Sequence, residues 1–133
     1  MSHNSATELN WHTWLVKGDQ YLRASKPGSN TNRFGTEIVY NLLSMSLESY
    51  IMAVLDVNHA LPDNHTYTDL FDALDLVMEV DIGLKSRILK YENIQSICSV
   101  DKYSTRKPTE MEIANLKAAL VEFSEIAHAA CEA

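Results

Sequence analysis

Two aspartates and two histidines lie close together near the middle of the chain and are candidates for a metal site: Asp56, His59, Asp63 and His65. Carboxylate and imidazole groups are suitable ligands for divalent metals, and residues three apart, such as Asp56 and His59, share one face of a helix. The helical HExxH pattern is absent, however, and these spacings do not establish a coordination geometry. We therefore interpret the four residues as a solvated helix end with its turn, and we predict no metal.

A second pair of residues could form an activated thiol. His128 and Cys131 are three apart in the last apolar segment, and a neighbouring base can hold a cysteine as the nucleophilic thiolate. Both residues lie close to the end of the sequence, where helices fray. We interpret Cys131 as a buried or unreactive thiol, and Cys98, which has no base near it in the sequence, as a core residue. Two cysteines are too few for a disulfide framework and are typical of a reducing compartment.

The glycines and the charge limit which ligands the chain binds. Its four glycines are isolated, so neither glycine-rich phosphate-binding motif is present. The formal net charge of −7 argues against nonspecific nucleic-acid binding, which requires a basic face. A short basic stretch, 102–107, still offers local contacts to an anion.

A narrow polar stripe interrupts the most apolar segment. Glu37, Asn41, Ser44 and Glu48 follow one another at steps of four, three and four residues, which places them on one side of a helix. The stripe faces solvent in one interpretation, as on most amphipathic helices; in the other it lines a cleft or meets a partner. We favour the solvent interpretation.

Apolar residues that recur at three- and four-residue steps predict helices along the whole chain. We expect the first from about Ser5 or Thr7 to Ser25. A longer helix, apolar around most of its circumference, is expected from Thr31 to Asn58, in the middle of the bundle. No stretch alternates with a period of two for long enough to predict a strand.

Capping residues indicate where three further helices begin. We place Thr68 as the N-cap of the third and Asp81 as the N-cap of the fourth. Thr109 and Glu112 have the spacing of a capping box at the start of the fifth, whose apolar stripe includes Phe123. The predicted fold class is therefore all-α: a compact up-and-down bundle of four to five helices that forms a single domain over residues 1–133.

Length and composition suit one domain with its own hydrophobic core, since 46% of the 133 residues are apolar. The longest strictly apolar stretch, Tyr50–Leu55, is far shorter than the roughly 20 residues of a transmembrane helix. Residues 1–6 lack the features of a signal peptide. We expect a cytoplasmic protein without a membrane partner.

Three segments together resemble the HEPN superfamily of small helical domains associated with nucleotide binding. Leu47–Leu55 is similar to the family's acidic residue and alanine-centred apolar run, although Met52 stands where a lysine is common. Pro62–His65, followed by two leucines, is similar to the proline, histidine and leucine segment before the third helix. Tyr103–Pro108 is similar to the tyrosine, arginine and proline stretch before the last helix. The resemblance covers nearly the whole chain through short, degenerate motifs.

The resemblance implies a helical bundle that commonly forms two-fold dimers. Many members are ribonucleases of toxin or defence systems, while others pair with small nucleotidyltransferases, bind nucleotides or have lost activity. The ribonucleases carry an arginine followed, after four to six residues, by a histidine. No arginine of this chain has a histidine at that distance, and Met111–Ile113 occupy those places after Arg106.

We therefore predict a non-catalytic HEPN-like domain that binds a nucleotide or a protein partner, without a cofactor, in a toxin–antitoxin or nucleotidyltransferase-associated system. The expected ligand contacts are Tyr103, Arg106 and Lys107, with Arg33 as a further candidate. The alternatives are a divergent HEPN ribonuclease or toxin, and a helical assembly module unrelated to the family. The surplus apolar surface of the second helix and the two tryptophans of the first predict a homodimer.

Overall fold

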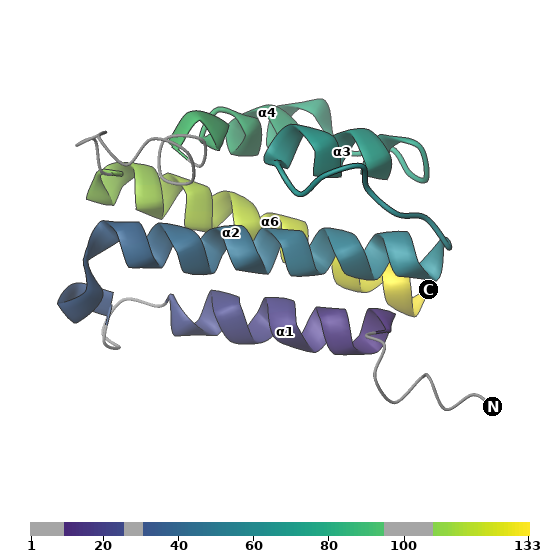
Figure 1. Cartoon of the computed structure of the whole chain (residues 1–133), viewed down its shortest axis with the longest axis horizontal. Helices are drawn as coiled ribbons and strands as arrows, with labels where there is room; N and C mark the ends of the chain where they lie inside the picture. Colours follow the sequence, from purple (N-terminus) through teal and green to yellow (C-terminus); the bar gives the residue numbers. More distant parts are fainter. Residues whose placement is uncertain (1–9, 26–30, 95–107) are drawn as a thin grey trace.

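The computed structural model describes residues 10–25, 31–94 and 108–133 (Figure 1). These ranges form five helices and no strand, which confirms the all-α prediction. The helices are α1 (Trp11–Ala24), α2 (Thr31–Val57), α3 (Tyr67–Asp75), α4 (Ile82–Leu89) and α6 (Glu110–Glu132).

The helix α2 lies at the centre of the bundle. It runs between α1 on one side and the α3–α4 pair on the other, and α6 packs behind it (Figure 1). The loop after α2 runs back along that helix, so that His65 contacts Glu48 and Tyr67 contacts Ser44. The central position agrees with the apolar circumference of α2, because only a helix with several neighbours can bury that much apolar surface.

The first helix begins later than the sequence predicts. Asn10 has an extended backbone, and its side chain accepts the backbone N–H of Thr13 at 2.9 Å. The prediction of a start at Ser5 or Thr7 is therefore wrong, because a helix from either residue would pass through this N-cap. The predicted end is confirmed to within a residue, since Ser25 is the C-cap.

The predicted bounds of the second helix, Thr31 to Asn58, are confirmed to within a residue. The helix has a kink at Gly35 that was not predicted. Gly35 has a φ of 80° and a ψ of 170°, a conformation open to glycine because it lacks a Cβ atom. At the other end His59 has a φ of 57°, and the N–H of Ala60 donates to the carbonyl of Leu55 at 2.8 Å. Bonds of this kind terminate helices, which agrees with the interpretation of this region as a helix end.

The predicted cap of α3 is wrong by two residues. Thr66, and not Thr68, has the extended backbone of an N-cap, and its hydroxyl accepts the N–H of Asp69 at 3.1 Å. Thr68 lies within the helix and donates from its hydroxyl to Glu92 at 2.6 Å. The Thr66 hydroxyl also donates to the Asp69 carboxylate at 3.0 Å.

The two remaining caps are confirmed. Asp81 accepts the N–H of Leu84 at 2.9 Å at the start of α4. Thr109 and Glu112 form the predicted capping box, with bonds of 3.1 and 2.9 Å between each side chain and the other's backbone N–H.

The core fills the space where α2 meets the other helices. Phe123 is fully buried, as predicted, and its ring lies edge-on to Phe71 with centroids 5.9 Å apart. Cys98, predicted to be a core residue, lies outside the described residues. By length and composition Gly35–Val57 is, among the described residues, the one helical stretch that could cross a membrane, but most of it is buried in the bundle. A core helix passes the same test.

Candidate functional site

Most of the predicted ligand contacts fall outside the part of the chain that the structure describes. Tyr103, Arg106 and Lys107 lie between residues 95 and 107, which are not described. Arg33 lies on the helical turn before Gly35, and its side chain is also outside the described part. These four assignments stay predictions.

The acidic and histidine residues around the end of α2 do not converge. His65 forms an ion pair through its Nδ1 with Glu48 of α2, while His59 adopts the left-handed backbone that ends the helix. Within the described ranges, no three His, Cys, Asp or Glu side chains come together in a way that could hold a metal ion.

The polar stripe of α2 divides into two halves. Glu37 and Asn41 are exposed, in agreement with the solvent interpretation. Ser44 shares a 2.7 Å hydrogen bond with the hydroxyl of Tyr67, and Glu48 pairs with His65. The second half therefore holds the returning loop and the start of α3 against α2.

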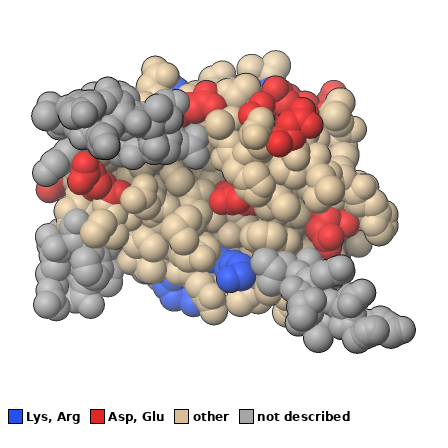
Figure 2. Space-filling view, viewed as in Figure 1, with Lys and Arg blue, Asp and Glu red and all other residues tan. Residues whose placement is uncertain are grey.

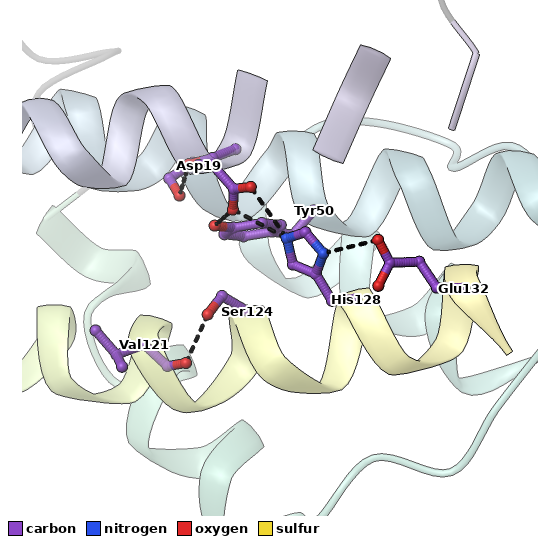
Figure 3. Close-up of polar contacts among 8 residues, drawn as sticks. Asp19, Tyr50, Val121, Ser124, His128 and Glu132 are labelled. Atoms are coloured by element: carbon purple, nitrogen blue, oxygen red, sulfur yellow. Dashed lines mark hydrogen bonds and ion pairs between the residues drawn. The ribbon is translucent and has the colours of Figure 1, made fainter. Parts of the chain in front are cut away.

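A cluster of polar side chains lies where α1, α2 and α6 meet, and we call it the Asp19 cluster (Figure 3). The hydroxyl of Tyr50 donates to Asp19 at 2.5 Å, and Nε2 of His128 lies 3.1 Å from both oxygens of the same carboxylate. On its other side, Nδ1 of His128 lies 3.4 Å from Glu132. One carboxylate of α1 therefore accepts bonds from both neighbouring helices.

A glycine makes this arrangement possible. A Cβ atom at Gly18 would lie 2.7 Å from two ring atoms of Tyr50, so the ring can lie against α1 only because that side chain is missing. The hydroxyl of Ser46 donates to the Gly18 carbonyl at 2.8 Å. The close approach of α1 and α2 brings the Tyr50 hydroxyl within reach of Asp19.

The electrostatics of the Asp19 cluster favour a neutral tyrosine and a charged histidine. Burial, and after it the hydrogen bond and charge of Asp19, raise the pKa of Tyr50. Partial burial alone would lower the pKa of His128, but the bonds to Asp19 and Glu132 and their charges outweigh it and raise that pKa. A tyrosine held as the phenol and an imidazolium paired on both nitrogens are poor bases. This geometry therefore suits the stabilisation of helix packing better than proton abstraction from a substrate.

The thiol of Cys131 is buried, as predicted. Burial, followed by the charges of Glu132 and Asp56, raises its pKa to about 11. A nucleophilic cysteine needs a lowered pKa. Both nitrogens of the neighbouring His128 are directed at carboxylates, so the imidazole does not activate the thiol.

Sequence reasoning missed the Asp19 cluster because its members are far apart along the chain. Asp19 and His128 are separated by 109 residues, and no spacing pattern connects them. The available signal was Gly18 inside an apolar helical face beside an aspartate. A glycine in that place indicates the close approach of a large side chain from another helix.

Two hollows lie on the surface of the α4 side of the molecule. The smaller, about 130 Å³, lies between α4 and α6 and is lined by Arg87, Lys90, Tyr91, Asn115 and Ala118. The larger, about 620 Å³, lies at the turn between α3 and α4 and is lined by Asp75, Met78, Glu79, Val80, Asp81, Ile82 and Lys85. We call these the α4–α6 hollow and the α3–α4 hollow.

Comparisons with protein-family models, curated proteins and solved structures found no match to this chain.

Proposed function

We propose that the chain is a non-catalytic, HEPN-like interaction domain that forms a homodimer and binds a protein partner. The observation that carries the proposal is a row of large apolar side chains on the outer side of α2. Ile38 and Met45 are 44% and 40% exposed although they belong to the central helix, and Met52, partly buried, continues the row. Exposed apolar rows on ordered helices are typical of interfaces.

The spacing of this row suits a two-fold axis. Ile38, Met45 and Met52 follow at steps of seven residues, so two antiparallel copies of α2 with Met45 on the axis would bring Ile38 against the partner's Met52. Glu48 would then face the partner's Leu42, whereas a parallel pair would set Glu48 against its own copy. Like charges in such places are repulsive, which favours the antiparallel pair. The middle of this face carries mostly uncharged side chains (Figure 2).

The bonds within the Asp19 cluster support a structural role for its carboxylate, phenol and imidazole groups. Tyr50, Asp19 and His128 bond to one another between helices, and the other nitrogen of His128 faces Glu132 of its own helix. No buried side-chain nitrogen or oxygen in the described ranges lacks a hydrogen-bond partner. Catalytic side chains, in contrast, need an open position for substrate.

Cysteine cross-linking tests the dimer and its register. In a background where Cys98 is replaced by serine, Met45→Cys should form a covalent dimer on mild oxidation, because a residue on the axis meets its own copy at a distance that a disulfide can span. A mixture of Ile38→Cys and Met52→Cys chains should form the heterodimer in preference to either homodimer. Val121→Cys on α6, a position 44% exposed, is the matched control and should remain monomeric. Cross-linking of Val121→Cys alone would contradict the proposed face.

An RNA-cleavage assay tests the non-catalytic part of the proposal. The chain lacks the family's histidine after Arg106, and the loss of a general acid or base lowers a rate by about 10²–10⁴. We expect no cleavage of single-stranded or transfer RNA, with or without chelator. Chelator-resistant cleavage that disappears in Arg106→Ala would contradict this part.

The α4–α6 hollow favours nucleotide binding as a second candidate function. Lys90 and Asn115 offer N–H donors, and Nζ of Lys90 lies 5.5 Å from the centre of the Tyr91 ring. Arg87 adds positive charge, with its Nη1 paired to Glu122 at 2.9 Å. The hollow is smaller than pockets for drug-sized ligands, which measure about 300–1,000 Å³, so it would take a phosphate group and leave the nucleoside outside. Nucleotides should then raise the melting temperature of the wild type but not of Lys90→Ala. Equal increases in the melting temperature of both proteins would exclude nucleotide binding in the α4–α6 hollow.

A further inference from the structure

The turn between α3 and α4 carries two of the most exposed large apolar side chains of the described protein. Leu76, the C-cap of α3, is 87% exposed, and Ile82, the first residue of α4, is 79% exposed. Between them, Met78 is partly buried and Val80 is buried against the core. Met78 and Val80 therefore form an anchored apolar part of the α3–α4 hollow. Ile82, which also lines the hollow, and Leu76, which lies beside it next to the lining residue Asp75, remain in water.

The same hollow has an acidic border. Asp75, Glu79 and Asp81 contribute three negative charges, and Lys85 contributes one positive charge, which leaves a net charge of −2. Lys85 is paired with Asp75, and Asp81 caps α4, so Glu79 is the carboxylate at the border for which the structure shows no such pairing. The C-terminal end of α3 adds partial negative charge. Acidic side chains also gather over α3 in the space-filling view (Figure 2).

Taken together, the apolar part and the acidic border define a class of ligand. We infer that the α3–α4 hollow binds a basic, amphipathic helix of a partner protein; this rests on the proposed function as a protein-interaction domain and specifies its partner. Apolar residues of such a helix at steps of three and four would meet Leu76 and Ile82. Its lysines or arginines would face Glu79 and the neighbouring carboxylates, which gives the contact its specificity.

The size and charge of the hollow favour a basic helix over a nucleotide, a second copy of the chain or an extended peptide. The hollow, about 620 Å³, is large enough for several side chains. A nucleotide would bring phosphate to a border of its own sign. A second copy of the chain, joined symmetrically through this turn, would set two acidic borders against each other. The ends of α3 and α4 form the walls, and neither offers the free strand edge that an extended peptide would pair with.

Fluorescence anisotropy with three labelled synthetic peptides of equal length tests the inference. The first is an amphipathic leucine–lysine helix, the second has the same composition in scrambled order, and the third is an amphipathic leucine–glutamate helix. The full-length wild type should bind the first at least tenfold more tightly than the other two. The affinity should fall as salt is added, because charged contacts are screened.

Variants of the turn identify the site. Leu76→Ser combined with Ile82→Ser should weaken binding of the leucine–lysine helix at least tenfold, and circular dichroism should confirm an unchanged fold. Glu79→Gln should weaken it severalfold at low salt, with the difference disappearing at high salt. Leu61→Ser is the matched control, because Leu61 is 80% exposed but lies before α3, away from the turn that carries Leu76 and Ile82, and it should bind like the wild type.

Each other outcome overturns the inference. Absent binding, equal binding of the scrambled helix, preference for the leucine–glutamate helix, or an unaffected double variant would each exclude this site as a receptor for basic helices. If the double variant instead converts a dimer to a monomer in light scattering, the occupant is a second copy. The Met45→Cys cross-link is independent of these results, so failure here leaves the proposed dimer standing, and failure of the cross-link leaves this site standing.

Discussion

The Asp19 cluster and the α3–α4 hollow differ in which side chains they bury and which they leave in water. In the cluster, polar side chains from three helices are paired with one another, and Tyr50 lies so close to α1 that only glycine fits at position 18. At the hollow, Leu76 and Ile82 are left in water. We expect the cluster to stabilise the isolated chain and the exposed side chains at the hollow to contribute little to its stability. The difference is between polar side chains that pair α1, α2 and α6 with one another and a turn that leaves apolar side chains in water.

Removing a large core side chain should change the free energy of unfolding far more than truncating an exposed side chain beside the α3–α4 hollow. Phe123→Ala should lower the free energy of unfolding by roughly 3–5 kcal/mol, because it removes a fully buried ring and leaves a cavity against Phe71. Leu76→Ala should change it by less than about 0.5 kcal/mol, as expected for an exposed site. Urea unfolding of both variants measures this. Equal destabilisation would mean that the turn is part of the core.

Adding one carbon atom where α1 contacts α2 should cause the next largest loss of stability. Gly18→Ala would place a methyl group 2.7 Å from the Tyr50 ring, and overpacking of this kind costs about 1–3 kcal/mol. Gly83→Ala is the matched control, since its new carbon would lie 3.2 Å from the side chain of Asp81 and meet no ring. A Gly18→Ala protein as stable as the wild type in thermal unfolding would show that α1 and α2 are less closely packed.

The capping box of α6 should make a smaller, local contribution. Thr109→Ala removes the acceptor for the N–H of Glu112 and should cost about 1 kcal/mol. Thr109→Ser keeps a hydroxyl at the same place and should retain most of the stability. A urea midpoint that falls equally in both variants would mean that the methyl group, not the cap, matters here.

The positive charge of His128 should make the smallest contribution to the free energy of unfolding, and this contribution should depend on pH. Asp19 and Glu132 raise the pKa of His128 in the folded protein, where Tyr50 lies beside the ring. The contribution of His128 to the free energy of unfolding is therefore fully present below its unfolded pKa of about 6.5. It is lost as the pH rises through the raised pKa of the folded state. Because the pair is one-third exposed, we expect less than about 1 kcal/mol. The advantage of the wild type over His128→Gln in urea should shrink as the pH rises above about 6.5. An advantage that grows as the pH rises would contradict the ion pair.

Local signals in the sequence were sufficient for most of the fold. The capping box at Thr109 and the cap at Asp81 were predicted correctly because each depends on neighbours three residues away. The error at α3 arose because Thr66 and Thr68 are both good caps, and only the position of Asp69 separates them. The kink at Gly35 was missed because an isolated glycine is also tolerated within a helix.

The candidate sites were harder to predict for a physical reason. Asp19 and His128 meet only after three helices have packed, and the exposure of Leu76 depends on where α3 ends rather than on its neighbours. Periodicity shows which face of a helix is apolar but not how much of that face the rest of the fold covers. The contacts expected from Tyr103, Arg106 and Lys107 lie outside the described residues and stay predictions.

Sedimentation of the wild type and of Met45→Lys over a range of micromolar concentrations tests the central claim most directly. The account predicts that the wild type sediments at twice the 15.0 kDa mass of one chain. Met45→Lys should sediment as a single chain and keep the thermal stability that the wild type has at concentrations too low for dimerisation, because the substitution lies on the surface row of α2. A wild type that remains at 15.0 kDa throughout, or a Met45→Lys protein that still dimerises, would contradict it.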